Sequence, residues 1–187
     1  MPPAVLSRDD VVARLMTVVR RQGYDGASLA ELSAATGLGR SSLYHHFPDG
    51  KDDMVAAVLE SLHGELEVTL FAPLRAPGPA VPRLNAMGAA LDAFYQHGRA
   101  HCLLASLGIG DASKRFHPRV KRIFRDWIRA IACALRDGGL PKAVARTRAE
   151  EALVRIEGAL LLARSLDDAS IFARTLRGLP AALLGAP

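Results

Sequence analysis

Residues 40 to 47 read Arg-Ser-Ser-Leu-Tyr-His-His-Phe, a run of polar and ring-bearing side chains. Hydroxyl, imidazole and guanidinium groups can donate hydrogen bonds to phosphate oxygens and to the edges of nucleic-acid bases. If the segment is helical, Tyr44, His45 and His46 cannot all point into one core, because successive side chains leave a helix in different directions. Some of these groups must therefore face solvent, where they suit a partner that carries phosphates.

A second group of residues, His97, His101 and Cys102, suggests metal chemistry, since histidines four residues apart share one face of a helix. The sequence offers no acidic third ligand at a convincing spacing, and Gly98 weakens a helix at this place. We therefore expect no metal and no cofactor. A small metal-dependent enzyme that uses these three residues remains the alternative.

Hydrophobic periodicity predicts the helices that must position the polar run. Ser7 with Asp10 and Ser28 with Glu31 form capping boxes, each with a serine at the helix start and an acidic residue three positions later. Gly37 supplies a turn, because glycine adopts a positive φ without steric cost. The predicted helices cover about residues 8–22, 28–36 and 39–46, and a fourth begins at Asp49 or Gly50.

A short helix, a turn through Gly37 and a second short helix make a helix-turn-helix arrangement. Leu38 and Leu43 would anchor the second helix inward. The helix starts at Ser28 and near Gly39 add backbone N–H groups that attract phosphate. A protein-interaction module that uses this geometry without DNA remains a further alternative. The outer side of the second helix would carry Arg40, Ser41, Ser42, Tyr44 and His45.

The bulk composition favours an all-α fold. Of the 187 residues, 50% are hydrophobic, and β-branched residues form no alternating runs. The formal net charge of +5 permits an anionic partner. Basic residues gather between Lys114 and Arg148, however, while residues 1–53 are close to neutral. A nucleic-acid-binding surface in the first part of the chain must therefore depend on geometry and not on net charge.

The sequence also indicates a cellular compartment. No apolar stretch approaches the roughly 18 residues that span a bilayer, so we expect no membrane partner. Met1 to Ser7 lack a charged start followed by a long apolar region, so we expect no signal peptide. Cys102 and Cys133 do not make a disulfide scaffold, and reduced thiols are expected. These features together predict a cytoplasmic protein.

The second part of the chain reads as a larger helical bundle. Prolines gather between Phe71 and Pro82, which predicts a loop or linker. A helix is then expected to start at Pro82, with Leu84, Met87, Leu91, Phe94 and Tyr95 on one face. The remaining predicted helices cover about residues 117–137, 147–165 and 168–184.

The segment "SLAELSAATGLGRSSLYHHFPDGKDDMVAAVL" resembles the N-terminal domain of the tetracycline-repressor (TetR) family of transcriptional regulators. The residues that carry the resemblance are Ser28, Gly37-Leu38-Gly39, Leu43-Tyr44-His45-His46-Phe47 and Lys51. The glycine in Pro-Asp-Gly-Lys and the tail "IEGALLLARSLDDASIFARTLRGLPAALL" are similar to the LmrA/YxaF-like branch of that family. Gly39 stands where a serine cap is usual in the family.

The resemblance implies an all-α protein with a three-helix helix-turn-helix DNA-binding domain over residues 1–52. A helical effector-binding and dimerisation domain would follow over residues 53–187. Tyr44 and His45 would contact phosphates, and Lys51 would clamp the DNA backbone. Arg40, Ser41 and Ser42 would approach bases. The predicted DNA-binding residues are Ser28, Arg40, Ser41, Ser42, Tyr44, His45 and Lys51.

The resemblance further implies a pocket for a small effector in the C-terminal bundle. Glu157 lies in an otherwise apolar run, and a carboxylate on a buried helix is costly unless Arg155, Arg164 or a ligand pairs with it. The predicted pocket residues are Met87, Leu91, Phe94, Tyr95, Trp127, Ile131 and Glu157.

The expected protein is a homodimeric repressor, not an enzyme. It would bind a near-palindromic operator in double-stranded DNA and be released by a small hydrophobic ligand. The last two helices of each subunit would pair into a four-helix interface. The predicted interface residues are Ala152, Ile156, Leu160, Ala163, Phe172 and Leu176.

Overall fold

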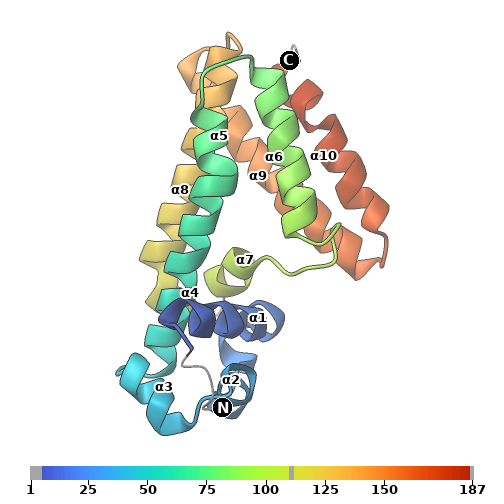
Figure 1. Ribbon diagram of the computed structural model, residues 1–187. Helices are drawn as coiled ribbons and strands as arrows, with labels where there is room; N and C mark the ends of the chain where they lie inside the picture. The colour runs from blue at the N-terminus through green and yellow to red at the C-terminus, as the bar shows by residue number, and fades with distance from the viewer. Residues whose placement is uncertain (1–5, 110–111, 186–187) are drawn as a thin grey trace. The chain divides into compact units, whose positions relative to one another are not determined.

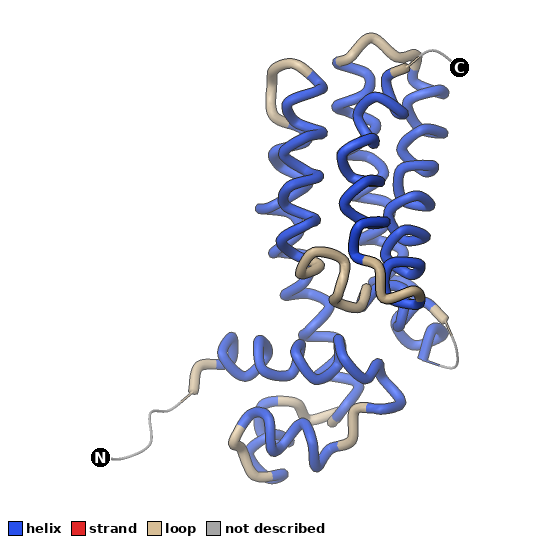
Figure 2. The backbone as a smooth tube through the Cα atoms, turned by 90° about the vertical axis from the view of Figure 1, so that its right-hand side faces the viewer, coloured by secondary structure: helices blue, strands red, loops and turns tan. Residues whose placement is uncertain are grey.

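The computed structural model describes residues 6–109 and 112–185, which form helices joined by loops and contain no strand (Figures 1 and 2). The all-α fold predicted from composition and periodicity is confirmed. Residues 1–5, which bear on the expectation of no signal peptide, lie outside the described residues. In the described part of the chain, none of the helices has both the length and the apolar character that a bilayer span requires.

The chain folds as two compact units. The first consists of Met1–Gly64 with Leu103–Val120, and the second of Glu65–Cys102 with Lys121–Pro187. The predicted functional division at residue 52 falls inside helix α4, Lys51–Leu66, which belongs to the first unit as far as Gly64. Packing places the boundary between the units after Gly64 and not at residue 52. The functional division at residue 52 stays a prediction.

The first unit gathers its helices around an apolar core. Its elements are α1 (Arg8–Gly26), α2 (Leu29–Thr36), α3 (Arg40–His46), the larger part of α4, α7 (Leu103–Gly108) and the start of α8 (Ala112–Asp137). Helix α1 packs against α2 and α7. The core side chains from α1 to α4 include Val11, Leu15, Val19, Leu32, Leu43, Met54 and Val58, all less than 1% exposed.

Both predicted capping boxes are present, at Ser7 with Asp10 and at Ser28 with Glu31. Helix α1 extends beyond its predicted end, as far as Gly26. Gly23 nevertheless interrupts the regular helix, with φ of 69°. The stop signal was therefore recognised correctly, but the chain resumes a helical path after it.

The second unit packs α-helices against one another. Its elements are the π-helix η1 (Glu67–Phe71), α5 (Ala72–Arg75), α6 (Ala80–Phe94), the rest of α8, α9 (Lys142–Ser165) and α10 (Ala169–Leu184). Helix α10 lies against both α9 and α6 (Figure 1). Helices α6, α8 and α9 all begin a few residues earlier than periodicity indicated.

The proline-rich segment from Phe71 to Pro82 is more ordered than the predicted loop. Helix α5 lies within it, and α6 begins before Pro82. Arg83 holds the segment: its Nη1 donates to the carbonyl oxygens of Leu74 at 2.9 Å and Ala76 at 2.7 Å. Arg83 is buried, and its Nη2 lies 3.0 Å from a carboxylate oxygen of Asp137. These partners satisfy a buried cation that would otherwise be destabilising.

The Ser28 cap provides a test of this local structure. Replacing Ser28 with alanine removes the side-chain acceptor for the Glu31 N–H, and we expect a loss of about 1 kcal/mol in the free energy of unfolding. Urea denaturation followed by circular dichroism measures it. The exposed Ser41 provides the control, since Ser41→Ala should change stability by less than about 0.5 kcal/mol. Equal stability of the Ser28→Ala variant and the wild type would contradict the capping role.

Candidate DNA-binding interface

The turn between α2 and α3 is fixed by side-chain hydrogen bonds. Gly37 ends α2 in the left-handed region, at φ 71° and ψ 9°. The hydroxyl of Ser33 donates to the carbonyl oxygen of Leu38 at 2.6 Å, and the Leu38 N–H donates to the hydroxyl of Thr36 at 3.3 Å. From α1, Arg14 donates to the Thr36 carbonyl oxygen at 3.1 Å. The two short helices are therefore held at a defined angle.

Helix α3 is anchored from one side. Leu43 is 0% exposed and Phe47, which follows the helix, is 1% exposed. His46 is half-buried, its ring 6.2 Å from the ring of Phe47. The outer side of α3 is exposed to solvent, and the side chains exposed there are Arg40, Ser41, Ser42, Tyr44 and His45. The structure thus leaves five of the predicted DNA-binding residues exposed on this helix.

Gly50, which follows α3, leaves space for the ring of Tyr44. Gly50 has a φ of 68°, and a Cβ added there would lie only 3.1 Å from Cε1 of the Tyr44 ring. A side chain at this position would both strain the backbone and push against the ring. Gly50 therefore lets the Tyr44 ring lie against the backbone while 44% of the residue stays exposed.

Ser28 lies at the start of α2, and its hydroxyl is already engaged. The hydroxyl donates to Glu31 Oε2 at 2.8 Å and accepts from the Glu31 N–H at 3.2 Å. The backbone N–H and then the hydroxyl of Ser28 hold the pKa of Glu31 below its usual value. A DNA phosphate at this helix start would share the Ser28 N–H and hydroxyl with the carboxylate of Glu31.

Lys51 begins α4 and is half-buried, with its Nζ 4.3 Å from the centre of the Tyr24 ring. An ammonium group over an aromatic face is stabilised electrostatically. Partial burial lowers the pKa of Lys51, and the carboxylates of Asp25, Asp52 and Glu31 oppose that shift. The predicted backbone clamp is therefore preorganised on Tyr24.

A hydrogen-bonded network beside Lys51 was not predicted from the sequence. The hydroxyl of Tyr24 donates a short hydrogen bond to Asp52, and Arg115 Nη1 donates to the Tyr24 oxygen at 2.8 Å. Arg115 Nη1 also lies 2.9 and 2.8 Å from the two carboxylate oxygens of Asp52. Tyr24 and then Arg115 hold the pKa of Asp52 below its usual value.

The predicted effector residues lie in the second unit, and most are core. Trp127 is 0% exposed, and its indole N–H has no hydrogen-bond partner among the described residues. Phe94 and Glu157 are half-buried. The remaining predicted pocket residues are buried, namely Met87, Leu91, Tyr95 and Ile131.

Glu157 ends a short polar chain in this core. The Tyr95 hydroxyl donates to Cys102 Sγ at 3.4 Å, and the Cys102 thiol donates to Glu157 Oε1 at 3.1 Å. Burial raises the pKa of Glu157, and the hydrogen bond from Cys102 opposes this only in part. The sequence suggested Arg155 or Arg164 as the partner of Glu157, and the structure instead places the Cys102 thiol there.

The three residues of the metal alternative have separate partners. His97 Nδ1 lies 2.7 Å from Asp92, His101 Nε2 lies 2.8 Å from Arg164, and Cys102 donates to Glu157. Since arginine only donates, His101 Nε2 accepts and is unavailable to a cation. In the part of the chain that the structure describes, no group of three or more His, Cys, Asp or Glu side chains is placed to hold a metal ion.

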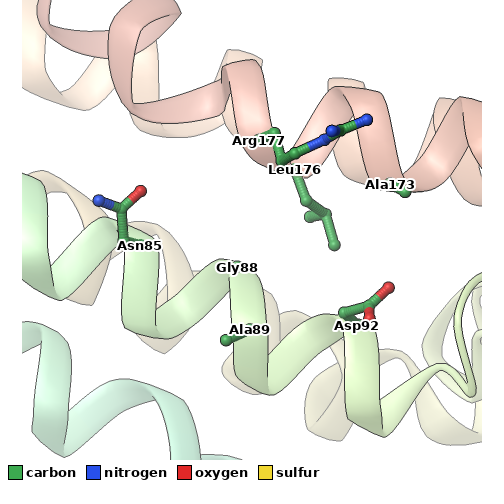
Figure 3. Close-up of a pocket in the computed structure, with 7 residues that line it drawn as sticks. All are labelled: Asn85, Gly88, Ala89, Asp92, Ala173, Leu176 and Arg177. Atoms are coloured by element: carbon green, nitrogen blue, oxygen red, sulfur yellow. The ribbon is translucent and has the colours of Figure 1, made fainter.

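A groove of about 320 Å³ separates α6 and α10, with Leu176 of α10 pointing toward α6 near Gly88 (Figure 3). Asp92 and Arg177 give its rim opposite charges. None of the predicted effector residues lines this groove, whose other lining residues are Asn85, Ala89 and Ala173.

The six predicted interface residues lie inside their own unit. Ala152, Ile156, Leu160, Ala163, Phe172 and Leu176 are all between 0% and 6% exposed. Such side chains have almost no surface left to bury against a partner. On the opposite face of α9, Val154 is 73%, Leu161 62% and Leu162 50% exposed.

Together, the helix-turn-helix and the helical bundle define a DNA-binding transcriptional regulator. The sequence pattern of the tetR family of bacterial regulatory proteins matches residues 13–58. The pattern of the LmrA/YxaF-like transcriptional regulator C-terminal domain matches residues 84–177. The chain belongs to the TetR family of transcriptional regulators.

A curated relative agrees with this assignment, and solved structures share the fold. The HTH-type transcriptional repressor DhaR of Mycobacterium sp. (strain GP1) is 25% identical over 150 residues, which cover 78% of this chain and 74% of DhaR. The fold is similar to a TetR transcriptional regulator from Legionella pneumophila, with a TM-score of 0.83, 18% identity and coverage of 96% and 98% of the two chains. A cysteine mutant of the TetR-family regulator CifR, solved with 26-bp operator DNA, has a TM-score of 0.76 at 22% identity, covering 100% of both chains.

Tyr44→Phe tests the outer face of α3. Loss of a hydroxyl that donates to a DNA phosphate should weaken operator binding by about 1–3 kcal/mol, with the fold unchanged. Fluorescence anisotropy with labelled operator measures the affinity. Tyr95→Phe makes the same change at a buried site in the second unit and, measured without effector, should leave the affinity unchanged. Operator binding by Tyr44→Phe at wild-type strength would contradict the assigned contact.

Glu157→Gln tests the half-buried carboxyl group. Because the pKa of Glu157 is raised in the folded protein, its stabilising contribution is present below the unfolded pKa and is lost as pH rises through the folded pKa. Glutamine cannot ionise and avoids that loss. The variant should therefore gain thermal stability over the wild type as pH rises from 5 to about 8.

The matched control for this comparison is Glu151→Gln, on the exposed side of the same helix. Differential scanning fluorimetry at several pH values gives the unfolding midpoints. A difference between Glu157→Gln and the wild type that stays constant with pH would contradict the raised pKa.

Proposed function

We propose that this transcriptional regulator is a repressor that binds operator DNA through helix α3. The observation that carries the proposal is the one-sided burial of α3, which leaves Arg40, Ser41, Ser42, Tyr44 and His45 exposed together. A helix of this kind enters the major groove, where its side chains reach phosphates and base edges. The relative DhaR is named a repressor, and CifR was solved with operator DNA, which support the proposal.

The DNA-bound form is proposed to be a homodimer. Helix α9 carries a second apolar stripe, Val154, Gly158, Leu161 and Leu162, at the spacing of one helix face. A groove of about 510 Å³ runs between this stripe and α10. Apart from the adjacent backbone of α9 itself, none of the described residues lies within 4 Å of a Cβ added at Gly158, so a partner helix has room to approach. Two copies of α9 and α10 would then pair as a four-helix interface.

Release by a small, largely apolar effector completes the proposal. The unpartnered indole N–H of Trp127 costs about 1–3 kcal/mol in a buried site and would be satisfied by an acceptor on a ligand. Glu157 offers a second polar contact in the same unit. A ligand that prefers the shape unable to bind DNA would lower operator affinity, since binding and conformation are linked.

Selection from a random DNA pool tests the DNA-binding function. The wild-type protein should enrich near-palindromic sites whose half-site centres lie about 34–36 Å apart, or a multiple of that distance. Sedimentation should show an even number of chains per site, and a single half-site should bind weakly. In a purified transcription assay, the protein should reduce transcript from a promoter that overlaps the site. Failure to enrich any DNA would contradict the proposal.

Val154→Glu tests the dimer face. Burying an unpaired carboxylate at an interface costs about 3–5 kcal/mol, so the dimer dissociation constant should rise at least about a hundredfold. Analytical ultracentrifugation measures it. Val68→Glu is the matched control, because Val68 is equally exposed at 73% but lies outside α9 and α10. A Val154→Glu variant that remains as dimeric as the wild type would exclude this face.

A further inference from the structure

Asp52 places a negative charge at the edge of the proposed DNA-binding surface. It follows Lys51, the predicted backbone clamp, in the first turn of α4. A carboxylate beside a phosphate-binding lysine repels the phosphate and competes for the ammonium group. Asp25 and Glu31 add further negative charge near Lys51. Something must therefore neutralise Asp52 if Lys51 is to bind DNA well, and this need rests on the proposed function.

The structure provides a counter-ion from a distant part of the chain. Arg115, at the start of α8, directs one Nη1 toward both carboxylate oxygens of Asp52, at 2.8 and 2.9 Å. Tyr24 donates its hydroxyl to the same carboxylate. The acceptor positions of Asp52 are thus turned toward Tyr24 and Arg115.

The guanidinium is itself held in place by aromatic contacts. Arg115 Cζ lies 5.6 Å from the centre of the Tyr24 ring, and the neighbouring Phe116 ring packs 5.4 Å from that of Tyr24. Phe116 is only 2% exposed, so the start of α8 is fixed on α1. Lys51 lies over the same Tyr24 ring. The Tyr24 ring therefore contacts both cations, the ammonium group of Lys51 and the guanidinium group of Arg115.

We propose that Arg115 is a positioning residue for DNA binding, which neutralises Asp52 and orients it away from the phosphate that Lys51 binds. Arg115 acts through Asp52 and Lys51 and does not contact DNA itself. Because the ion pair is exposed, at 57% and 44% of the two side chains, it contributes little to global stability. Its effect is expected in operator affinity and not in the unfolding midpoint.

A double-mutant cycle on the full-length protein tests the proposal with the selected operator. Arg115→Gln should raise the operator Kd about two- to fivefold, the range expected from an exposed ion-pair network. Asp52→Asn alone should leave the Kd unchanged or lower it. In the Asp52→Asn background, adding Arg115→Gln should have almost no further effect, because the charge that Arg115 neutralises is gone.

Arg119→Gln is the matched control. Arg119 lies four residues later on α8 and pairs with Glu60 of α4 at 3.5 Å, so its loss changes net charge equally without touching Asp52. Its operator Kd should stay at the wild-type value. Arg115→Lys, which keeps the charge, should restore part of the affinity lost in Arg115→Gln. Thermal unfolding of each variant identifies any loss of fold.

Three results would overturn the proposal. An unchanged Kd for Arg115→Gln, while the wild type binds its operator, would remove the role of Arg115 and leave the proposed function intact. A loss that persists fully in the Asp52→Asn background would mean that Arg115 contacts DNA directly or supports the fold. Absence of operator binding by the wild-type protein would instead reject the proposed function, and this proposal with it.

Discussion

The presentation of helix α3 depends on two buried side chains. A helix of seven residues is not stable alone in water, so α3 exists because Leu43 and Phe47 are buried in the core of the first unit. Their position fixes which side of the helix faces solvent, and that side carries hydrogen-bonding groups. Losing either anchor would cost about 2–5 kcal/mol and release the whole proposed DNA-binding surface at once. The proposed DNA specificity and the stability of the fold are therefore coupled at this helix.

The features that could be predicted from the sequence are local ones. Ser28 and its partner Glu31 are three residues apart, and Gly37 needs only its own backbone conformation, so both are visible in a short stretch of sequence. The helix-turn-helix and its exposed residues followed from such signals. The segment from Phe71 to Pro82 was predicted wrongly as a loop. Its helix α5 is held by Arg83, whose acceptors lie several residues away in the chain.

Features that depend on distant partners were missed for a physical reason. Helix α9 is apolar on two faces, and periodicity alone could not decide whether Leu160 or Val154 lies in the subunit's own core. Burial decides it, in favour of Leu160. The contact of Arg115 with Asp52 joins residues far apart in sequence, and neither residue type is unusual at its position. The same helix, α8, carries Trp127 further along, so one element contributes both to the proposed clamp and to the second unit, where we propose that an effector binds.

Dimethyl sulfate footprinting tests most directly whether α3 occupies the major groove. The reagent methylates guanine N7, which lies in the major groove, and adenine N3, which lies in the minor groove. With the wild-type protein bound to an operator that has guanine in each half-site, this account predicts protection of N7 at two symmetry-related positions. Adenine N3 between them should stay reactive. Bound protein that leaves guanine N7 fully reactive and protects adenine N3 instead would contradict the account.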